Sequence, residues 1–415
     1  MSPKSARTLL FCVGVTVSLS CHAWAQTPPA ATFGRSDDEK GLTDAQLLGK
    51  RIFEDTNLSE PRGQSCSSCH DPKHAFQGDN GSPVPGIAAG STPDRLGRRK
   101  TPTVMYKTYS PAFGFYKDID EGKETLEAKG GQFWDGRASD LAEQVAAPLL
   151  DSVEMNNPSI EAVVDKVKTG PYAELVKSVF GADAFSDPKV AMRNLSGAVY
   201  AYEATERFAP FSSKFDDYLR GKATLTPIEA RGFELFKDPK KGNCIACHVG
   251  KTDSKDPTDW IFTDFTYDAL GAPRNPKIPA NADPTVFDLG LCKRPGLAAI
   301  LPKEIKLGSL CGAFRVPTLR NVAVAGAYYH NAAFTSLRDA IAFYATRDTD
   351  PQRWYPRLKT GEADKFDDLP GAYKQNVNAG EVPYDRRPGQ RPRLSGQDID
   401  ALAAFLKTLT DKGME

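Results

Sequence analysis

Apolar residues recur at helical spacing in several stretches of the chain, and most of these stretches begin with side chains that can cap a helix. Thr43 and Gln46 form a capping box before one stretch. Thr226 and Glu229 form another, with Pro227 at the first helical position. The pattern therefore predicts a helix after each of these caps.

Two further amphipathic helices are predicted in the middle and at the end of the chain. One follows Pro188, and the other begins at Ser395, which forms a capping box with Asp398. The last helix places these apolar residues on one face: Ile399, Leu402, Phe405, Leu406 and Leu409. No stretch sustains the alternation typical of a half-buried strand, so we expect a mainly α fold with few, short strands.

The two capped helices at Thr43 and Thr226 end in related sequences. The first ends in GKRIFED (49–55) and the second in GFELFKD (232–238), which share Gly, Phe and Asp in register. Each segment is followed by the pattern C-x-x-C-H: Cys66, Cys69 and His70 in the first copy, and Cys244, Cys247 and His248 in the second. The repeat indicates two related domains.

The C-x-x-C-H spacing is the attachment signal for haem c. Both thiols form thioethers to the porphyrin, and the adjacent histidine becomes an axial ligand of the iron. Two copies in one chain predict two covalently bound haem c groups. A zinc site or two redox dithiols are the alternatives.

The first 25 residues are typical of a secretory signal peptide. Lys4 and Arg7 precede a short apolar run, and Ala23 and Ala25 supply the small residues that a signal peptidase reads. An uncleaved N-terminal anchor and a lipoprotein site at Cys21 are the alternatives. We expect cleavage near Ala25, no membrane span afterwards, and a periplasmic location.

Composition narrows the function classes further. The chain has 53 Lys plus Arg and 53 Asp plus Glu, so its formal net charge is zero, which argues against a nucleic-acid partner and a polybasic membrane surface. Of its 8 cysteines, Cys292 and Cys311 belong neither to the signal nor to the haem motifs. In an oxidising compartment we expect them to form a disulfide, with two free buried thiols as the alternative.

Few side chains remain to fill the sixth coordination positions of two haems. Only His74 and His330 are left among the histidines of the exported chain. Its methionines are Met105, Met155, Met192 and Met414. An electron carrier usually fills both positions with His or Met, whereas an enzyme leaves one iron open to its substrate.

The order of motifs resembles the bacterial di-haem cytochrome c peroxidases, and within them the MauG-like branch, which includes MauG and MbnH-type enzymes. The resemblance extends from about Leu42 to Thr410. Besides the haem motifs, it rests on the segments 101–103 (TPT), 130–137 (GGQFWDGR), 153–155 (VEM), 314–321 (FRVPTLRN) and 328–331 (YYHN). It implies two cytochrome c-like haem domains with long ordered loops, at 26–210 and 211–415.

The resemblance also implies roles for individual residues. The haem at His70 is expected to react with hydrogen peroxide, with Glu154 as its catalytic carboxylate and Gln144 and Pro148 nearby. Trp134 is expected to carry electrons between the haems. Tyr344 stands where conventional peroxidases have a methionine ligand, so we expect His248 and Tyr344 to bind the second iron.

Two departures from the family pattern stand out. Lys100 occupies the place of an asparagine that reaches a calcium ion, so we expect no calcium and predict that the Lys100 amine bonds the carbonyls of Ala325 and Ala327 instead. Gly242 occupies the place of a surface tryptophan that MauG uses to reach its substrate. Trp260 or Trp354 could provide another exit for electrons.

Together these features predict a periplasmic oxidoreductase of the peroxidase type. Hydrogen peroxide is expected to form a high-valent, bis-ferryl type state that oxidises a Trp or Tyr of a partner protein. One alternative is a cytochrome c peroxidase that reduces peroxide to water with electrons from a small cytochrome or cupredoxin. The other is a non-catalytic di-haem electron carrier.

Overall fold

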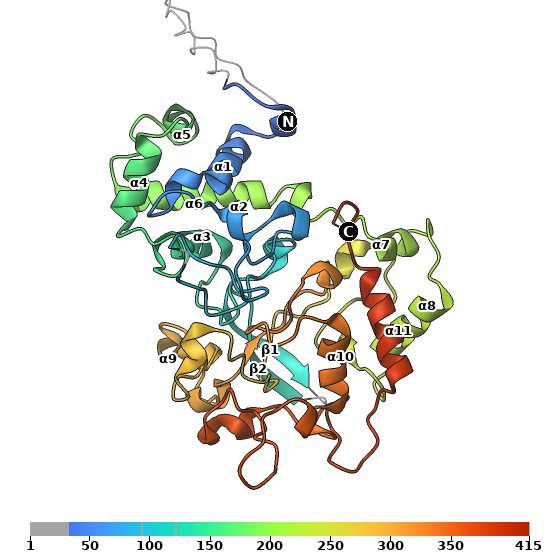
Figure 1. Cartoon of the computed structure of the whole chain (residues 1–415). Helices are drawn as coiled ribbons and strands as arrows, with labels where there is room; N and C mark the ends of the chain where they lie inside the picture. Colours follow the sequence, from blue (N-terminus) through green and yellow to red (C-terminus); the bar gives the residue numbers. More distant parts are fainter. Residues whose placement is uncertain (1–32, 93, 121–122, 415) are drawn as a thin grey trace, which may run out of the picture.

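A computed structural model describes residues 33–414 except 93 and 121–122 (Figure 1). Its helices and strands are α1 (Asp44–Glu54), α2 (Cys66–Cys69), β1 (Gly114–Asp120), β2 (Lys123–Lys129), α3 (Leu141–Leu150), α4 (Ile160–Lys168), α5 (Ala173–Phe180), α6 (Pro188–Glu203), α7 (Lys214–Leu219), α8 (Pro227–Lys237), β3 (Tyr267–Asp268), α9 (Leu297–Ile300), β4 (Phe314–Arg315), α10 (Leu337–Thr346) and α11 (Gly396–Lys407). The mainly α prediction is confirmed. The signal peptide predicted at 1–25 lies outside the described residues, and no helix in the described part is long and apolar enough to cross a membrane.

The helices gather around two large apolar cores. The first core takes its buried residues from Leu47 to Phe211, and the second from Phe215 to Leu409. In Figure 1, α1 and α3 to α6 lie in the upper part of the molecule, whereas α8, α10 and α11 lie together in the lower part. The chain passes from one core to the other between Phe211 and Phe215.

The glycines of the sequence repeat mark the closest helix contact in each core. α1 packs against α6, and a Cβ at Gly49 would lie 2.0 Å from the carbonyl oxygen of Ala198. α8 packs against α11, and a Cβ at Gly232 would lie 2.0 Å from the carbonyl oxygen of Ala401. A larger residue at either position would force the two helices apart. The same close helix contact in both cores therefore explains why both repeats have a glycine there.

A two-stranded hairpin links the two halves of the molecule. β1 and β2 pair in antiparallel register, and the pair lies beside the lower half in Figure 1. Ala128 of β2 packs in a small core with Ala269, Leu291 and Ala313, and the Tyr267 hydroxyl donates to the carbonyl of Gly130 at 2.7 Å. The sequence did not predict this hairpin, because the strands interleave charged residues on both faces instead of alternating apolar with polar.

The turn-rich segments are folded against the cavities described below. Segment 79–99 contributes Ala88, Ala89 and Gly97 to one cavity. Segments 253–288 and 348–392 contribute residues such as Asp268 and Tyr384 to the other. Cys292 and Cys311 form a disulfide whose Cα atoms are 4.8 Å apart.

Candidate functional site: two haem cavities

The two C-x-x-C-H segments share the same backbone hydrogen bond, although the first forms the short helix α2 and the second a 3-10 turn. The amide of His70 donates to the carbonyl of Cys66, and the amide of His248 donates to that of Cys244, each at 2.9 Å. Each imidazole is oriented by its Nδ1 atom, which lies 3.0 Å from the carbonyl of Phe76 in His70 and 3.1 Å from that of Phe262 in His248. A carbonyl at Nδ1 fixes the tautomer and leaves Nε2 free to bind a metal.

Each motif borders a large cleft. His70 and Cys69 line a cleft of about 1570 Å³, and the second motif lines one of about 1520 Å³. All four motif cysteines are free thiols, and burial lowers the pKa of both histidines to about 4, so both imidazoles are neutral at pH 7. Two thiols, a neutral imidazole with free Nε2 and an adjoining cleft are the donor set that haem c requires. The residues present therefore fit two haem c groups.

The three side chains that the family resemblance places near peroxide all line the cleft at His70. α3 presents Gln144 and Pro148, one turn apart, and Glu154 follows shortly after the helix; all three line the cleft. Burial raises the pKa of Glu154 to about 7, Asp151 adds to the rise, and Arg137 opposes it. Glu154 can therefore both take and return a proton near neutral pH.

The cleft at His70 offers no second haem ligand among the residues described around it. Its lining contains one histidine, His70 itself, and no methionine. The charged lining is mixed: Arg98, Arg99, Lys100, Lys107 and Arg137 stand beside Asp135, Asp151, Glu154 and Asp288. If a haem were bound here, the basic residues could pair with its carboxylates.

Lys100 makes different contacts from those expected. Its amine donates to Gln77 Oε1 at 2.7 Å and to the carbonyl of Thr101 at 3.1 Å. The predicted bonds to the carbonyls of Ala325 and Ala327 are therefore wrong: the side chain turns toward Gln77 and the cleft. Burial lowers the pKa of Lys100 to about 7.

Trp134 lies between the two clefts and lines both. Its indole Nε1 donates to the carbonyl of Lys100 at 2.8 Å, and its own carbonyl accepts from the amide of Arg315 at 2.8 Å. These bonds hold the ring at the junction of the two halves. The indole is thus placed where an electron relay between two haems would have to be.

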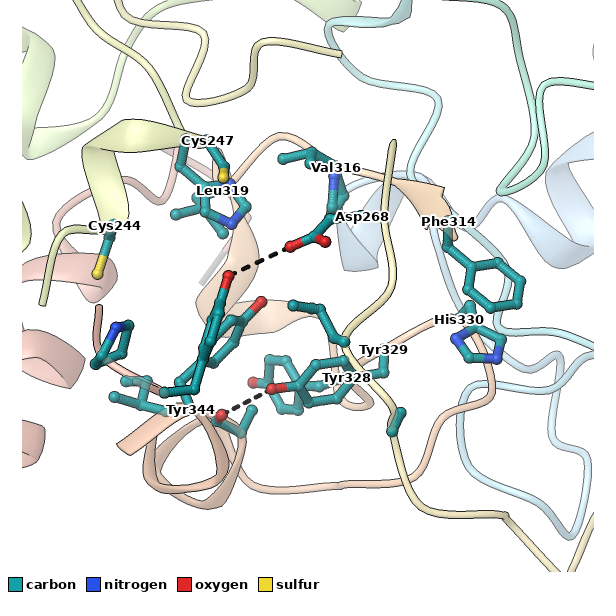
Figure 2. Close-up of a pocket in the computed structure, with 18 of the residues that line it drawn as sticks. Cys244, Cys247, Asp268, Phe314, Val316, Leu319, Tyr328, Tyr329, His330 and Tyr344 are labelled. Atoms are coloured by element: carbon teal, nitrogen blue, oxygen red, sulfur yellow. Dashed lines mark hydrogen bonds between the residues drawn. The ribbon is translucent and has the colours of Figure 1, made fainter. Parts of the chain in front are cut away.

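The second cleft is apolar and lined by tyrosines (Figure 2). Tyr344 of α10 projects into it, with the Tyr329 ring centroid 5.8 Å away and that of Tyr384 6.3 Å away. No methionine lines this cleft in the described part of the chain. Burial, followed by the nearby thiol of Cys247 and carboxyl of Asp268, raises the pKa of Tyr344 above its ordinary value.

His330 lies in the same cleft, away from the motif cysteines (Figure 2). Its ring stacks on Phe314 with centroids 3.5 Å apart, and its Nε2 atom is buried without a hydrogen-bond partner. The structure thus separates His330 from Tyr344, which stands nearer to Cys244 and Cys247 in the view.

Several lining residues were not singled out from the sequence. Asp268, which accepts a 3.3 Å hydrogen bond from the Tyr384 hydroxyl, and Lys107 belong to this group. Asp268 lies in the two-residue strand β3 and Lys107 begins a short 3-10 turn, and neither segment carries a motif that could have indicated them. The two tryptophans considered as exits for electrons differ in exposure. Trp260 is buried with 1% exposure, whereas Trp354 is half-buried.

Comparisons with known proteins agree with this geometry. Residues 43–224 match the model of the family "Di-haem cytochrome c peroxidase". The methylamine utilization protein MauG of Paracoccus denitrificans is 36% identical over 395 residues, 93% of each chain. The cytochrome c551 peroxidase of Pseudomonas aeruginosa is 30% identical over 303 residues, 71% of this chain and 70% of the relative.

Solved structures give the same picture. The diheme peroxidase BthA of Burkholderia thailandensis is 43% identical and superposes with a TM-score of 0.82, covering 94% of this chain and 89% of that one. A MauG-like protein associated with microbial copper homeostasis, 22% identical with a TM-score of 0.59, shares the fold. Two haem cavities joined by Trp134, together with a relative that matches along nearly the whole chain, show that this chain belongs to the MauG-like branch of the di-haem cytochrome c peroxidase family.

Proposed function

We propose that this protein is a di-haem c enzyme that uses hydrogen peroxide at the His70 site to withdraw electrons from a tryptophan or tyrosine of a partner protein. The observation that carries the proposal is the contrast between the clefts. The first is rich in charged side chains and contains Glu154 and Gln144 with no methionine, whereas the second is mostly apolar and contains Tyr344. One site is thus suited to peroxide and the other to holding an oxidising equivalent.

The first cleft supplies the acid and base that cleavage of peroxide needs. When bound, haem c supplies an iron that accepts a peroxide oxygen and gives up electrons. Glu154 would remove a proton from the oxygen nearer the iron and return it to the departing one. Gln144, on the same cleft wall, can orient peroxide by hydrogen bonding.

The second cleft supplies an anionic ligand. Tyr344 bound to the iron as phenolate would lower the potential of that haem, because haem potential follows the axial ligand. A low potential would favour storage of an oxidising equivalent there, with His248 and Tyr344 as the residues that would hold this haem. Trp134 would pass electrons between the sites.

The molecular setting completes the proposal. We place the boundary of the two haem domains at 210/211, where the apolar cores also divide. Lys100 takes the place of a calcium ligand. Export to the periplasm, with cleavage near Ala25, would provide the oxidising space that the Cys292–Cys311 disulfide needs.

A peroxidase that reduces peroxide to water with electrons from a small cytochrome or cupredoxin is the second candidate. Its support is the 30% identity to a cytochrome c551 peroxidase. The non-catalytic carrier is not retained, because the family consists of enzymes that act with peroxide.

Stoichiometric peroxide distinguishes the two candidates. We expect the fully oxidised holoprotein to react at once, seen as a change in haem absorption that persists without a partner. A protein that reacts only after one haem has been reduced would be a conventional peroxidase and would contradict the proposal.

A further inference from the structure

An unbroken row of aromatic rings leads from Tyr344 to the surface. Tyr329 follows Tyr344 with ring centroids 5.8 Å apart, and Phe334 follows Tyr329 at 5.3 Å. Trp354 follows Phe334 at 5.5 Å. A parallel branch runs from Tyr329 through Phe343 to Trp354, at 5.4 and 5.7 Å. All these separations are those of rings in contact.

Trp354 ends this row at the surface. It and Phe334 are both half-buried and line one surface groove, together with Pro85, Lys277, Asp339 and Arg353. Tyr384, the other ring that contacts Tyr344, is 5% exposed. Of the two rings at the groove, only the indole is readily oxidised, so Trp354 is the oxidisable end of the row that a partner can reach.

We propose that Trp354 is the residue through which electrons enter from the partner protein. The inference rests on the proposed function. A residue of the partner gives one electron to oxidised Trp354, which has itself lost one electron through Phe334 or Phe343 and Tyr329 to the second haem site. Two such transfers, with two protons, convert one hydrogen peroxide to two water molecules and leave the partner oxidised by two electrons.

The surroundings of Trp354 suit a short-lived oxidised ring. Its indole proton is held by a 3.0 Å hydrogen bond to Thr346 Oγ1, so the ring can lose an electron without losing the proton. The Arg353 guanidinium lies 4.2 Å from the ring centroid and also pairs with Asp339 at 3.1 Å. A cation above the ring disfavours a second positive charge there, which drives the oxidised ring to take an electron from the partner.

Spin trapping followed by peptide mass spectrometry tests the inference on the holoenzyme without any partner. After stoichiometric peroxide in the presence of a nitroso spin trap, we expect an adduct on the peptide that contains Trp354. Trp354→Phe should lose this adduct and slow the decay of the oxidised state several-fold, and Trp354→Tyr should restore decay. The control Tyr200→Phe removes the hydroxyl of an exposed tyrosine outside this row and should change neither.

The double variant Phe334→Leu, Phe343→Leu separates internal transfer from direct attack. It interrupts both ring branches and leaves Trp354 in place, so transfer through the rings predicts much less adduct. An undiminished adduct in the double variant, or wild-type decay in Trp354→Phe, would overturn the inference while leaving the proposed function intact. If peroxide changes no haem absorption in any variant, the proposed function fails and the inference fails with it.

Discussion

At the scale of single residues, the two clefts differ in the titratable side chain that each contains. Glu154 lies in a cleft where burial brings the pKa of its carboxyl to about 7, so its charge changes near physiological pH. Tyr344 lies in an apolar cleft without methionine among its described lining residues. A proton-transfer group on one side and an anionic ligand on the other would give the two irons different tasks.

Glu154→Gln should slow the reaction with peroxide by about 10²- to 10⁴-fold, because an amide cannot take the proton. In the wild type the rate should fall as the pH drops below about 7, since protonated Glu154 is no longer a base. Stopped-flow haem absorption measures both effects.

In Glu154→Gln the rate should not fall as the pH drops below about 7, because the amide does not titrate. Glu161→Gln, at an exposed carboxylate of α4, is the matched control and should react like the wild type. A pH profile that keeps its step in Glu154→Gln would assign that step to another group.

At the scale of elements, the sequence correctly predicted where several helices begin, because the residues that cap a helix are next to it in the chain. The capping boxes at Thr43, Thr226 and Ser395 are present in the structure. The N-cap of α6 is Asp187, directly before Pro188, where the sequence predicted the helix to begin. The β1–β2 hairpin was missed because its pairing is stabilised by contacts with the distant second half of the chain, which leave no local pattern.

Gly49→Ala should destabilise the protein by about 1–3 kcal/mol, the cost of overpacking a close contact. The added methyl would meet the carbonyl of Ala198 at 2.0 Å. Thermal unfolding of the holoprotein measures the effect.

Gly197→Ala is the control for this prediction. It lies within α6, and a Cβ there meets nothing within 4 Å. Helix propensity alone should make this variant slightly more stable, by about 0.5–1 kcal/mol. Equal effects at the two glycines would contradict the packing explanation.

At the scale of the whole molecule, function depends on how the halves are held together. Trp134 borders both clefts, and Arg99 beside it pairs with Asp135 at 2.7 Å and with Asp288 at 2.6 Å. The sequence motifs indicated which residues belong to the site. They could not indicate that Lys100 turns toward Gln77 or that His330 stacks on Phe314, because those contacts depend on loops with no regular pattern.

Arg99→Gln should destabilise the protein by about 3 kcal/mol, because it leaves Asp288 without its cation, while Asp135 keeps its pair with Arg137. Chemical denaturation of the holoprotein measures this loss. Arg338→Gln breaks an exposed pair with Asp400 and should leave the unfolding midpoint almost unchanged. If the two variants unfold alike, the pairs of Arg99 do not hold the halves together.

The central claim is one open haem at His70 and one haem closed by Tyr344, and electron paramagnetic resonance of the fully oxidised holoprotein tests it most directly. We predict one high-spin, five-coordinate signal and one low-spin signal. In Tyr344→Met the low-spin signal should shift and the potential of that haem should rise, while the high-spin signal stays the same. Two low-spin signals in the wild type, or a low-spin signal unaffected by Tyr344→Met, would contradict the account.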